Sequence, residues 1–265
     1  MKGHVYYSSA DAERNRGFID DLMLQASRME ISLTLLLDED EPDDEVDFIL
    51  FRTRNPMLAE RWESAGFRVI NRSEVNRIAN DKLNTFELAT LLGVSVIPTT
   101  KARSILDLPP LPIVLKTTDG HGGDEVFLCQ TKDEAEEVFS KFAGRRLIAQ
   151  PYIESNSTDI RVFMLGDEVL GAVKRIGSNS FKSNYTLGGT VEKYMLSEWQ
   201  ESEARKIAKA LKSDYIGIDF LLLPNGDWLL NEIEDPVGAR SLYVTHDFSV
   251  AEKLLEYVKK KLEDF

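Results

Sequence analysis

Cysteine, histidine and long apolar runs are the features that this sequence has least of. One cysteine, Cys129, stands among 265 residues, so no disulfide can form within the chain, and a reducing cytoplasm is the expected compartment. Because Cys129 ends an apolar stretch, a buried strand thiol is favoured over a nucleophile. The three histidines show no metal-binding spacing, and no stretch approaches 18 uncharged apolar residues. The first 18 residues also lack the apolar core of a signal peptide, so we expect neither a membrane span nor secretion.

The charge balance excludes two further classes of protein. A formal net charge of -13 argues against a general nucleic-acid or anionic-membrane binder, because such surfaces need clustered Lys and Arg. A local basic pocket for a phosphate remains compatible with it. Neither a GxxxxGK[ST] phosphate loop nor a dinucleotide-binding fingerprint occurs, and no Ser-His-Asp or Cys-His signature points to covalent catalysis.

The first third of the chain alternates strand and helix patterns. Apolar spacing predicts strands at 5–7, 31–37, 48–51 and 67–70, with helices at 16–28 and 57–65 between them. This rhythm is typical of a small parallel sheet covered by helices.

The rest of the chain is richer in strands. We predict strands at 113–116, 126–130, 147–149, 161–165, 169–175, 218–223 and 228–232. Helices are predicted at 80–92, from Thr131 to 142 with a capping box formed by Thr131 and Glu134, at 197–211 and at 248–262. We expect the last helix to pack on the C-terminal part of the chain.

A glycine-rich loop follows the strand that ends in Lys116. Gly120, Gly122 and Gly123 flank His121, and glycines allow backbone N–H groups to approach an anion closely. A lysine at the strand end supplies a point charge for a phosphate oxygen. A plain β-hairpin with a glycine turn is the alternative, and the residues alone do not decide between the two.

Three carboxylates lie on two strands near the C-terminus. Glu232 and Glu234 are two residues apart and therefore point to the same face of a strand, and Asp219 on the neighbouring strand can face them. Carboxylate oxygens suit Mg²⁺. The alternative is a solvent-facing acidic strand pair, which the apolar sequence around Asp219 disfavours.

Two weaker patterns could also belong to a nucleotide site. The apolar strand that runs into residues 150–153 could present backbone groups to an adenine, although a core strand is the default interpretation. Lys174 and Arg175, followed by Lys182 and the pair Gly188 and Gly189, could clamp a triphosphate. A surface charge cluster is the alternative.

Together, and in this order, these pieces resemble the RimK-type carboxylate–amine ligases of the ATP-grasp superfamily. The resemblance begins at Asn71 and at Asn80, Asp81 and Lys82, continues through the motifs above, and covers most of the chain. It implies an α/β fold, α+β in its ATP-binding lobes, with a small parallel-sheet domain before the ATP-grasp part. The implied divisions are 1–78, 79–150 and 151–265.

The resemblance also implies the roles of individual residues. ATP would be bound by Lys82, Lys116, Gly120, His121, Gly122, Gly123, Gln150, Pro151, Tyr152, Ile153, Asp159 and Arg161. Mg²⁺, or Mn²⁺ in its place, would be held by Asp219, Glu232 and Glu234. Arg175 and Lys182 would face the reacting phosphate, and Asn184 would help to form the acceptor pocket. Arg240, which we expect in a loop at 235–240, is a candidate for gripping a substrate carboxylate, with a surface arginine as the alternative.

Three positions depart from the family pattern. Glu234 stands where the family usually has asparagine, Lys182 where it has arginine, and Leu187 where an arginine often occurs. A lysine lacks the bidentate phosphate geometry of arginine. The last two changes lie on the substrate side, so glutamate is not carried over as the substrate.

The expected activity is ATP-dependent joining of a carboxylate to an amine through an acyl phosphate, with release of ADP and phosphate. The substrates would be a small acid and an amine, such as amino acids or a peptide terminus. A small-molecule kinase on the same scaffold and an ATP-binding protein without turnover are the alternatives. The sequence does not decide the oligomeric state, and a homo-oligomer stays open.

Overall fold

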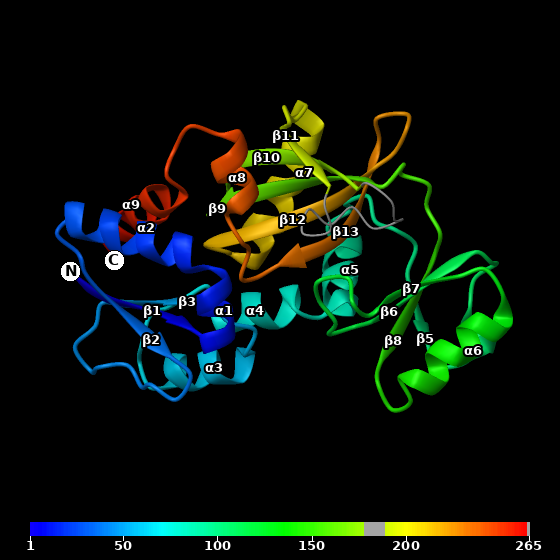
Figure 1. The fold of residues 1–265 in the computed structure, drawn as a ribbon, viewed down its shortest axis with the longest axis horizontal. Coiled ribbons are helices and arrows are strands. Elements are labelled where there is room, and N and C mark those ends of the chain that lie inside the picture. Colours follow the sequence, from blue (N-terminus) through cyan, green and yellow to red (C-terminus); the bar gives the residue numbers. More distant parts are fainter. Residues whose placement is uncertain (178–188, 264–265) are drawn as a thin grey trace.

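Three β-sheets follow one another along the described part of the chain (Figure 1). The structure is a computed structural model, and it describes residues 1–177 and 189–263. The element order is mixed α/β, as the sequence predicts.

The first sheet is parallel, as predicted, with the order β2-β1-β3-β4. Its strands are β1 (Lys2–Tyr7), β2 (Ser32–Leu37), β3 (Phe48–Phe51) and β4 (Val69–Ile70). The helices around it are α1 (Ser9–Arg14), α2 (Arg16–Arg28), α3 (Pro56–Ser64) and α4 (Ser73–Ala79). All four residues of β3 are buried, as expected for a parallel strand covered on both faces.

The second sheet lies at the other end of the molecule and has the order β5-β8-β6-β7. Its strands are β5 (Thr100–Ala102), β6 (Ile113–Thr117), β7 (Val126–Cys129) and β8 (Leu147–Pro151), and all neighbours are antiparallel. The 3-10 helix η1 (Ile105–Asp107) and the helix α6 (Lys132–Lys141) pack beside it. The predicted capping box of Thr131 and Glu134 is present, and Cys129 is buried in β7.

The third sheet lies between the other two and has the order β11-β10-β9-β12-β13 (Figure 1). Its strands are β9 (Thr158–Leu165), β10 (Glu168–Ile176), β11 (Thr190–Lys193), β12 (Tyr215–Leu222) and β13 (Trp228–Glu234). One face shares a core with α4, α5 (Lys82–Leu91) and α7 (Glu198–Leu211). The other face carries the polar residues of the candidate site.

Several short elements were missed by the sequence patterns. These are α1, α4, β5, β11 and α8 (Arg240–Thr245), and the longest of them, α4, has seven residues. Fewer than two helical turns give little periodicity to detect. The prediction that Arg240 lies in a loop is therefore wrong, because it is the first residue of α8.

The C-terminal helix α9 (Val250–Glu263) packs on the C-terminal part of the chain, as expected, and also on the N-terminal region. It lies beside α2 of the N-terminal region (Figure 1), and Leu254 and Val258 share a core with Phe18 and Leu22. Buried residues of β9 and β10 belong to the same core. The helix therefore joins the N-terminal sheet to the third sheet, and the divisions at 78 and 150 stay a prediction. Within the described residues, no helix is long and apolar enough to cross a membrane.

Candidate active site

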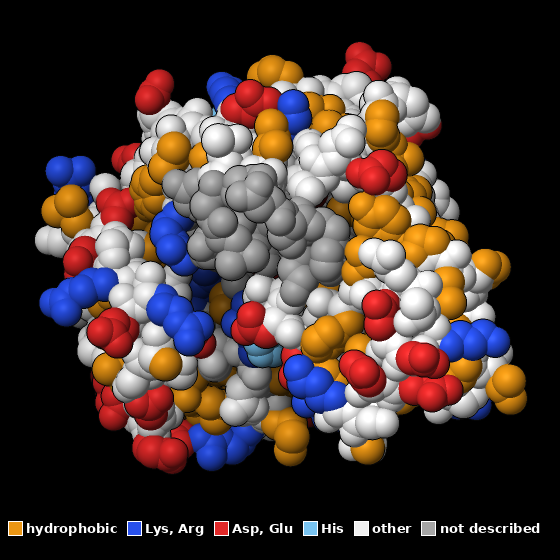
Figure 2. All heavy atoms as spheres, turned by 45° about the vertical axis from the view of Figure 1, so that its right-hand side comes forward, with side chains coloured by type: hydrophobic (Ala, Val, Ile, Leu, Met, Phe, Trp, Pro, Cys, Tyr) orange, Lys and Arg blue, Asp and Glu red, His pale blue; other side chains and the backbone are white. Residues whose placement is uncertain are grey.

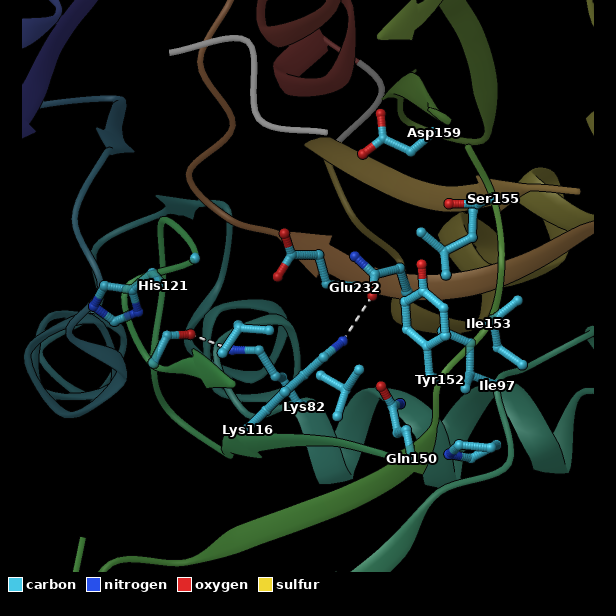
Figure 3. A pocket seen from close by; sticks show the side chains of 17 residues that line it. Lys82, Ile97, Lys116, His121, Gln150, Tyr152, Ile153, Ser155, Asp159 and Glu232 are labelled. Atoms are coloured by element: carbon cyan, nitrogen blue, oxygen red, sulfur yellow. Dashed lines mark hydrogen bonds between the residues drawn. The ribbon is translucent and has the colours of Figure 1, made fainter. Parts of the chain in front are cut away.

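A cavity lies between the second sheet and strands β12 and β13 of the third (Figure 3). The predicted nucleotide ligands that line it are Lys82, Lys116, Gly120, His121, Gly123, Gln150, Pro151, Tyr152, Ile153 and Asp159. Six further residues line it that sequence reasoning did not propose, namely Ile97, Val114, Val126, Ser155, Leu221 and Asn231. Four of these six are apolar residues, which no sequence signal separates from ordinary core.

Two lysines meet in this cavity from different elements (Figure 3). Lys82 is the first residue of α5, whose N-cap Asp81 accepts the backbone N–H groups of the first turn, and its Nζ donates to the carbonyl of Gly120. Lys116 is only 6% exposed, and its Nζ donates to Asn231 Oδ1 at 2.8 Å. Burial lowers the pKa of Lys116 to about 8, although the Glu232 carboxylate opposes this shift. Two cations in an enclosed site favour an anionic ligand.

The glycine-rich loop is a hairpin turn that also lines the cavity. Strands β6 and β7 pair up to Lys116 and Val126, so the loop spans the residues between them. Gly122 and Gly123 have positive φ values of 68° and 82°, which side chains rarely adopt. A Cβ added to Gly120 would lie 2.3 Å from Thr117 Oγ1, too close for any side chain. The hairpin alternative from the sequence is therefore confirmed, and the phosphate-binding role of this turn stays a prediction.

The opposite end of the cavity is apolar. Phe86, Ile97 and Ile148 form a buried cluster there, against which Ile153 and Leu221 pack. Figure 3 shows Ile97, Tyr152 and Ile153 together at this end, away from His121. An apolar slot with a few polar groups suits a flat aromatic ring.

A row of alternating charges crosses the third sheet. Arg175 of β10 donates to both oxygens of Asp159 at 2.6 Å and to Asp219 at 2.7 Å. Arg161 of β9 donates to both oxygens of Asp219 at 2.7 and 2.6 Å and to Glu234 at 2.6 Å. Burial would raise the pKa of the fully buried Asp219, but the two guanidinium groups hold it below its usual value. Arg161 was predicted among the nucleotide ligands, yet it lies within this row.

The three predicted metal ligands are brought together. Asp219 pairs directly with Glu232 in the sheet, and one oxygen from each of Asp219, Glu232 and Glu234 lies within 4.8 Å of the others. Oxygens on opposite sides of a Mg²⁺ ion are about 4.2 Å apart, so this oxygen set fits such a cation after a small contraction. Burial raises the pKa of Glu234, which Arg161 opposes. The same arginine would have to share Asp219 and Glu234 with a bound cation.

A second cavity adjoins the first on the N-terminal side. It is lined by Tyr7, Asp11, Arg14, Asn15, Arg52, Arg54, Gly122, Arg161, Arg175, Glu234, Pro236, Gly238, Arg240 and Ser241. Six of these residues are arginines and only Asp11 and Glu234 are acidic, although the whole chain is acidic. Within the described residues, Arg54 and Arg240 form no salt bridge or hydrogen bond through their side chains. Figure 2 shows several Lys and Arg side chains on the left-hand half of this view.

The loop behind β13 is held by the N-terminal region. Asn71 and Asn76 donate to the two carboxylate oxygens of buried Asp235 at 2.8 and 2.9 Å. Buried Arg52 donates to the carbonyl of Val237. Burial raises the pKa of Asp235 to about 6, although the two amide hydrogen bonds oppose this shift. This clamp places Glu234 and the start of α8 beside the second cavity.

Two predicted residues of the catalytic set, Lys182 and Asn184, lie outside the described residues, as do Leu187 and Gly188.

Comparisons with known proteins agree with this geometry. Residues 88–258 match the model of the RimK-like ATP-grasp domain. A probable alpha-L-glutamate ligase of Shewanella sp. (strain MR-4) is 32% identical over 77% of this chain and 71% of its own length. Among solved structures, D-cycloserine synthetase aligns with a TM-score of 0.76 and 19% identity over 99% of this chain and 100% of its own. The D-alanine–D-alanine ligase of Bacillus anthracis in complex with ATP aligns with a TM-score of 0.76 and 15% identity over 100% of this chain and 98% of its own. The chain therefore has the ATP-grasp fold and belongs to the RimK-like ATP-grasp family, whose ligases depend on ATP and Mg²⁺.

Proposed function

We propose that this chain is a ligase that activates a carboxylate with ATP and joins it to an amine. The observation that carries the proposal is that residues in direct contact with one another line two different cavities. Glu232 and Asp159 line the first cavity, whereas Glu234 and Arg175 line the second. ATP in the first cavity and an acid in the second would meet at these residues. The acid would receive the γ-phosphate there, and ADP would remain in the first cavity.

The nucleotide would lie with its adenine in the apolar end of the first cavity. Lys82 and Lys116 would then meet its phosphates, and Asp159 its ribose. The glycine turn would approach the phosphates through backbone N–H groups.

Mg²⁺ would be held by Asp219, Glu232 and Glu234, where it would neutralise charge on the transferring phosphate. The residues of this chain bind and orient the reactants around it. Arg161 and Arg175 are already fixed by their carboxylate partners, so their positions would cost little reorganisation during the reaction.

The reaction would proceed in two steps. A carboxylate oxygen of the acid attacks the γ-phosphorus of ATP, the bond to the leaving ADP breaks, and an acyl phosphate forms. The neutral amine then attacks the acyl carbon, the C–O bond to phosphate breaks, and the amine loses its proton to solvent. Arg175, Lys182 and Asn184 are proposed to stabilise or position the intermediate, and the glycine turn to exclude water.

The second cavity would bind an acid with more than one negative group. Arg54, between β3 and α3, and Arg240, at the start of α8, offer two separate cationic positions. The name of the Shewanella relative supports an amino acid among the substrates. We therefore propose an acidic amino acid or a peptide terminus.

The test is Mg²⁺-dependent release of ADP and phosphate with pooled amino acids and small acids, using hydroxylamine as the trapping amine. The expected result is hydroxamate formation by the wild type and its loss in Lys116→Ala. Exposed Lys132→Ala, on α6, serves as the control for loss of one lysine. Phosphate transfer to a hydroxyl acceptor without hydroxamate would contradict the ligase and favour a kinase.

A further inference from the structure

A β-bulge changes which side chains of β13 reach the first cavity. In the pairing of β12 with β13, Asp219 lies opposite Glu232, but the next residue, Phe220, lies opposite Leu230. Asn231 is therefore the extra residue of the bulge and has no partner of its own in β12. In a regular strand, Asn231 and Glu232 would point to opposite faces. Here both line the same cavity.

The bulge is anchored on its other side. The backbone N–H of Leu230 donates to the carbonyl of Ser95 at 2.8 Å, and Val96 forms an isolated bridge to Leu230. The segment 95–96 precedes Ile97, which belongs to the apolar end of the cavity. The position of Asn231 is thus determined by contacts on two sides of the strand.

Among the described residues, only one of the two polar groups of the Asn231 side chain has a hydrogen-bond partner. Its Oδ1 accepts the hydrogen bond from Lys116 Nζ at 2.8 Å (Figure 3, dashed line from Lys116). Its Nδ2 has no hydrogen-bond partner among the residues that the structure describes. An ammonium group has three N–H donors, so a bond to Asn231 orients the remaining two.

We propose that Asn231 is a nucleotide-binding residue that acts in two ways. Its Oδ1 orients the Lys116 ammonium, and its Nδ2 donates a hydrogen bond to a phosphate oxygen of the bound nucleotide. An amide is suited to both tasks because it carries an acceptor and a donor on one carbon. An aspartate has the same shape but only acceptors, and its charge would repel a triphosphate. The inference rests on the nucleotide site of the proposed function and adds a residue to it.

The test compares ATP with adenosine in wild type, Asn231→Asp and Asn231→Ala. Dissociation constants are measured with Mg²⁺ present, by titration calorimetry for ATP and by displacement of a fluorescent nucleotide for adenosine. We expect Asn231→Asp to weaken ATP binding by at least about tenfold, since a hydrogen bond to a charged group is lost and a repulsion is added. Asn231→Ala should weaken it less. Adenosine binding should change by less than about twofold, the scatter of ordinary surface substitutions.

The control is Asn225→Asp, the same change of charge at the exposed tip of the β12–β13 hairpin. It should leave both affinities unchanged. Equal losses for ATP and adenosine in Asn231→Ala would show that Asn231 only shapes the cavity, and unchanged ATP binding in both variants would overturn the inference directly. If Asn231→Asp does not fold, Asn231→Ala alone decides between these results. If the wild type does not bind ATP, the nucleotide site as a whole is overturned. If the wild type forms hydroxamate and both variants bind ATP with unchanged affinity, only the role of Asn231 is overturned.

Discussion

ATP binding should weaken as the pH rises above about 8, because Lys116 then loses its proton. Burial lowers the pKa of this lysine to about 8 in the free protein, with Lys82 adding to the shift and Glu232 opposing it. A triphosphate beside the ammonium favours the charged form, so the bound complex has a higher pKa. Binding at higher pH therefore requires uptake of a proton, and the affinity falls.

The size of the effect follows from this linkage. At pH values well above the pKa of Lys116 in the free protein and below its pKa in the complex, the dissociation constant of ATP should rise about tenfold per pH unit. This corresponds to about 1.4 kcal/mol of binding free energy per pH unit. Between pH 7 and 8 the dissociation constant should rise by only about twofold, because about half of Lys116 is still protonated at pH 8. Titration calorimetry from pH 7 to 9.5, at constant ionic strength and Mg²⁺, would give the profile.

Lys116→Arg is the matched variant for this measurement. A guanidinium stays protonated throughout the range, so its profile should be flat even if the affinity is lower. Lys82→Arg should retain the wild-type slope. A flat profile in the wild type, or the same slope in Lys116→Arg, would refute the assignment of the titration to Lys116.

Two other predictions concern the region behind β13. The pKa of Asp235 is raised from 3.8 to about 6 in the folded state, so its favourable contribution to stability is present below pH 3.8 and is lost as the pH rises through 6. Relative to Asp235→Asn, the wild type should lose about 2 kcal/mol of unfolding free energy between pH 4 and 7 in chemical denaturation. A difference that does not change with pH would contradict this account. Arg54→Ala and Arg240→Ala should each raise the KM of the acidic substrate about tenfold or more, the value of one charge-assisted hydrogen bond, while leaving the dissociation constant of ATP unchanged. A parallel loss of ATP affinity would mean that these arginines support the first cavity instead.

Local patterns in the sequence were sufficient for most elements. The helix predicted at 16–28 has those bounds, since its apolar spacing is decided within the segment itself. The capping box at Thr131 is equally local. The carboxylates Asp219, Glu232 and Glu234 could be placed together because a short hairpin joins their two strands.

The charge row and the second cavity could not be predicted from local patterns, because both bring together segments that are distant in the sequence. Arg161 and Arg175 could be named as cations of the site, but the carboxylate that they share, Asp219, lies on β12, whose register against β9 is decided by long-range pairing. Arg54 and Arg240 are far apart in sequence and meet only because the N-terminal region packs on the loop behind β13.

Residue types and local periodicity thus determined most of the helices and strands and the order of the motifs along this chain. Only the tertiary structure decided that Asn231 faces the first cavity, since strict alternation from Glu232 would place it on the other face. The same is true of α9, whose apolar stripe predicts a buried face but not the partner that buries it. An apolar stripe on a helix or an alternation along a strand can be read from one segment. A bulge, a strand register or a packing partner depends on how two segments contact each other.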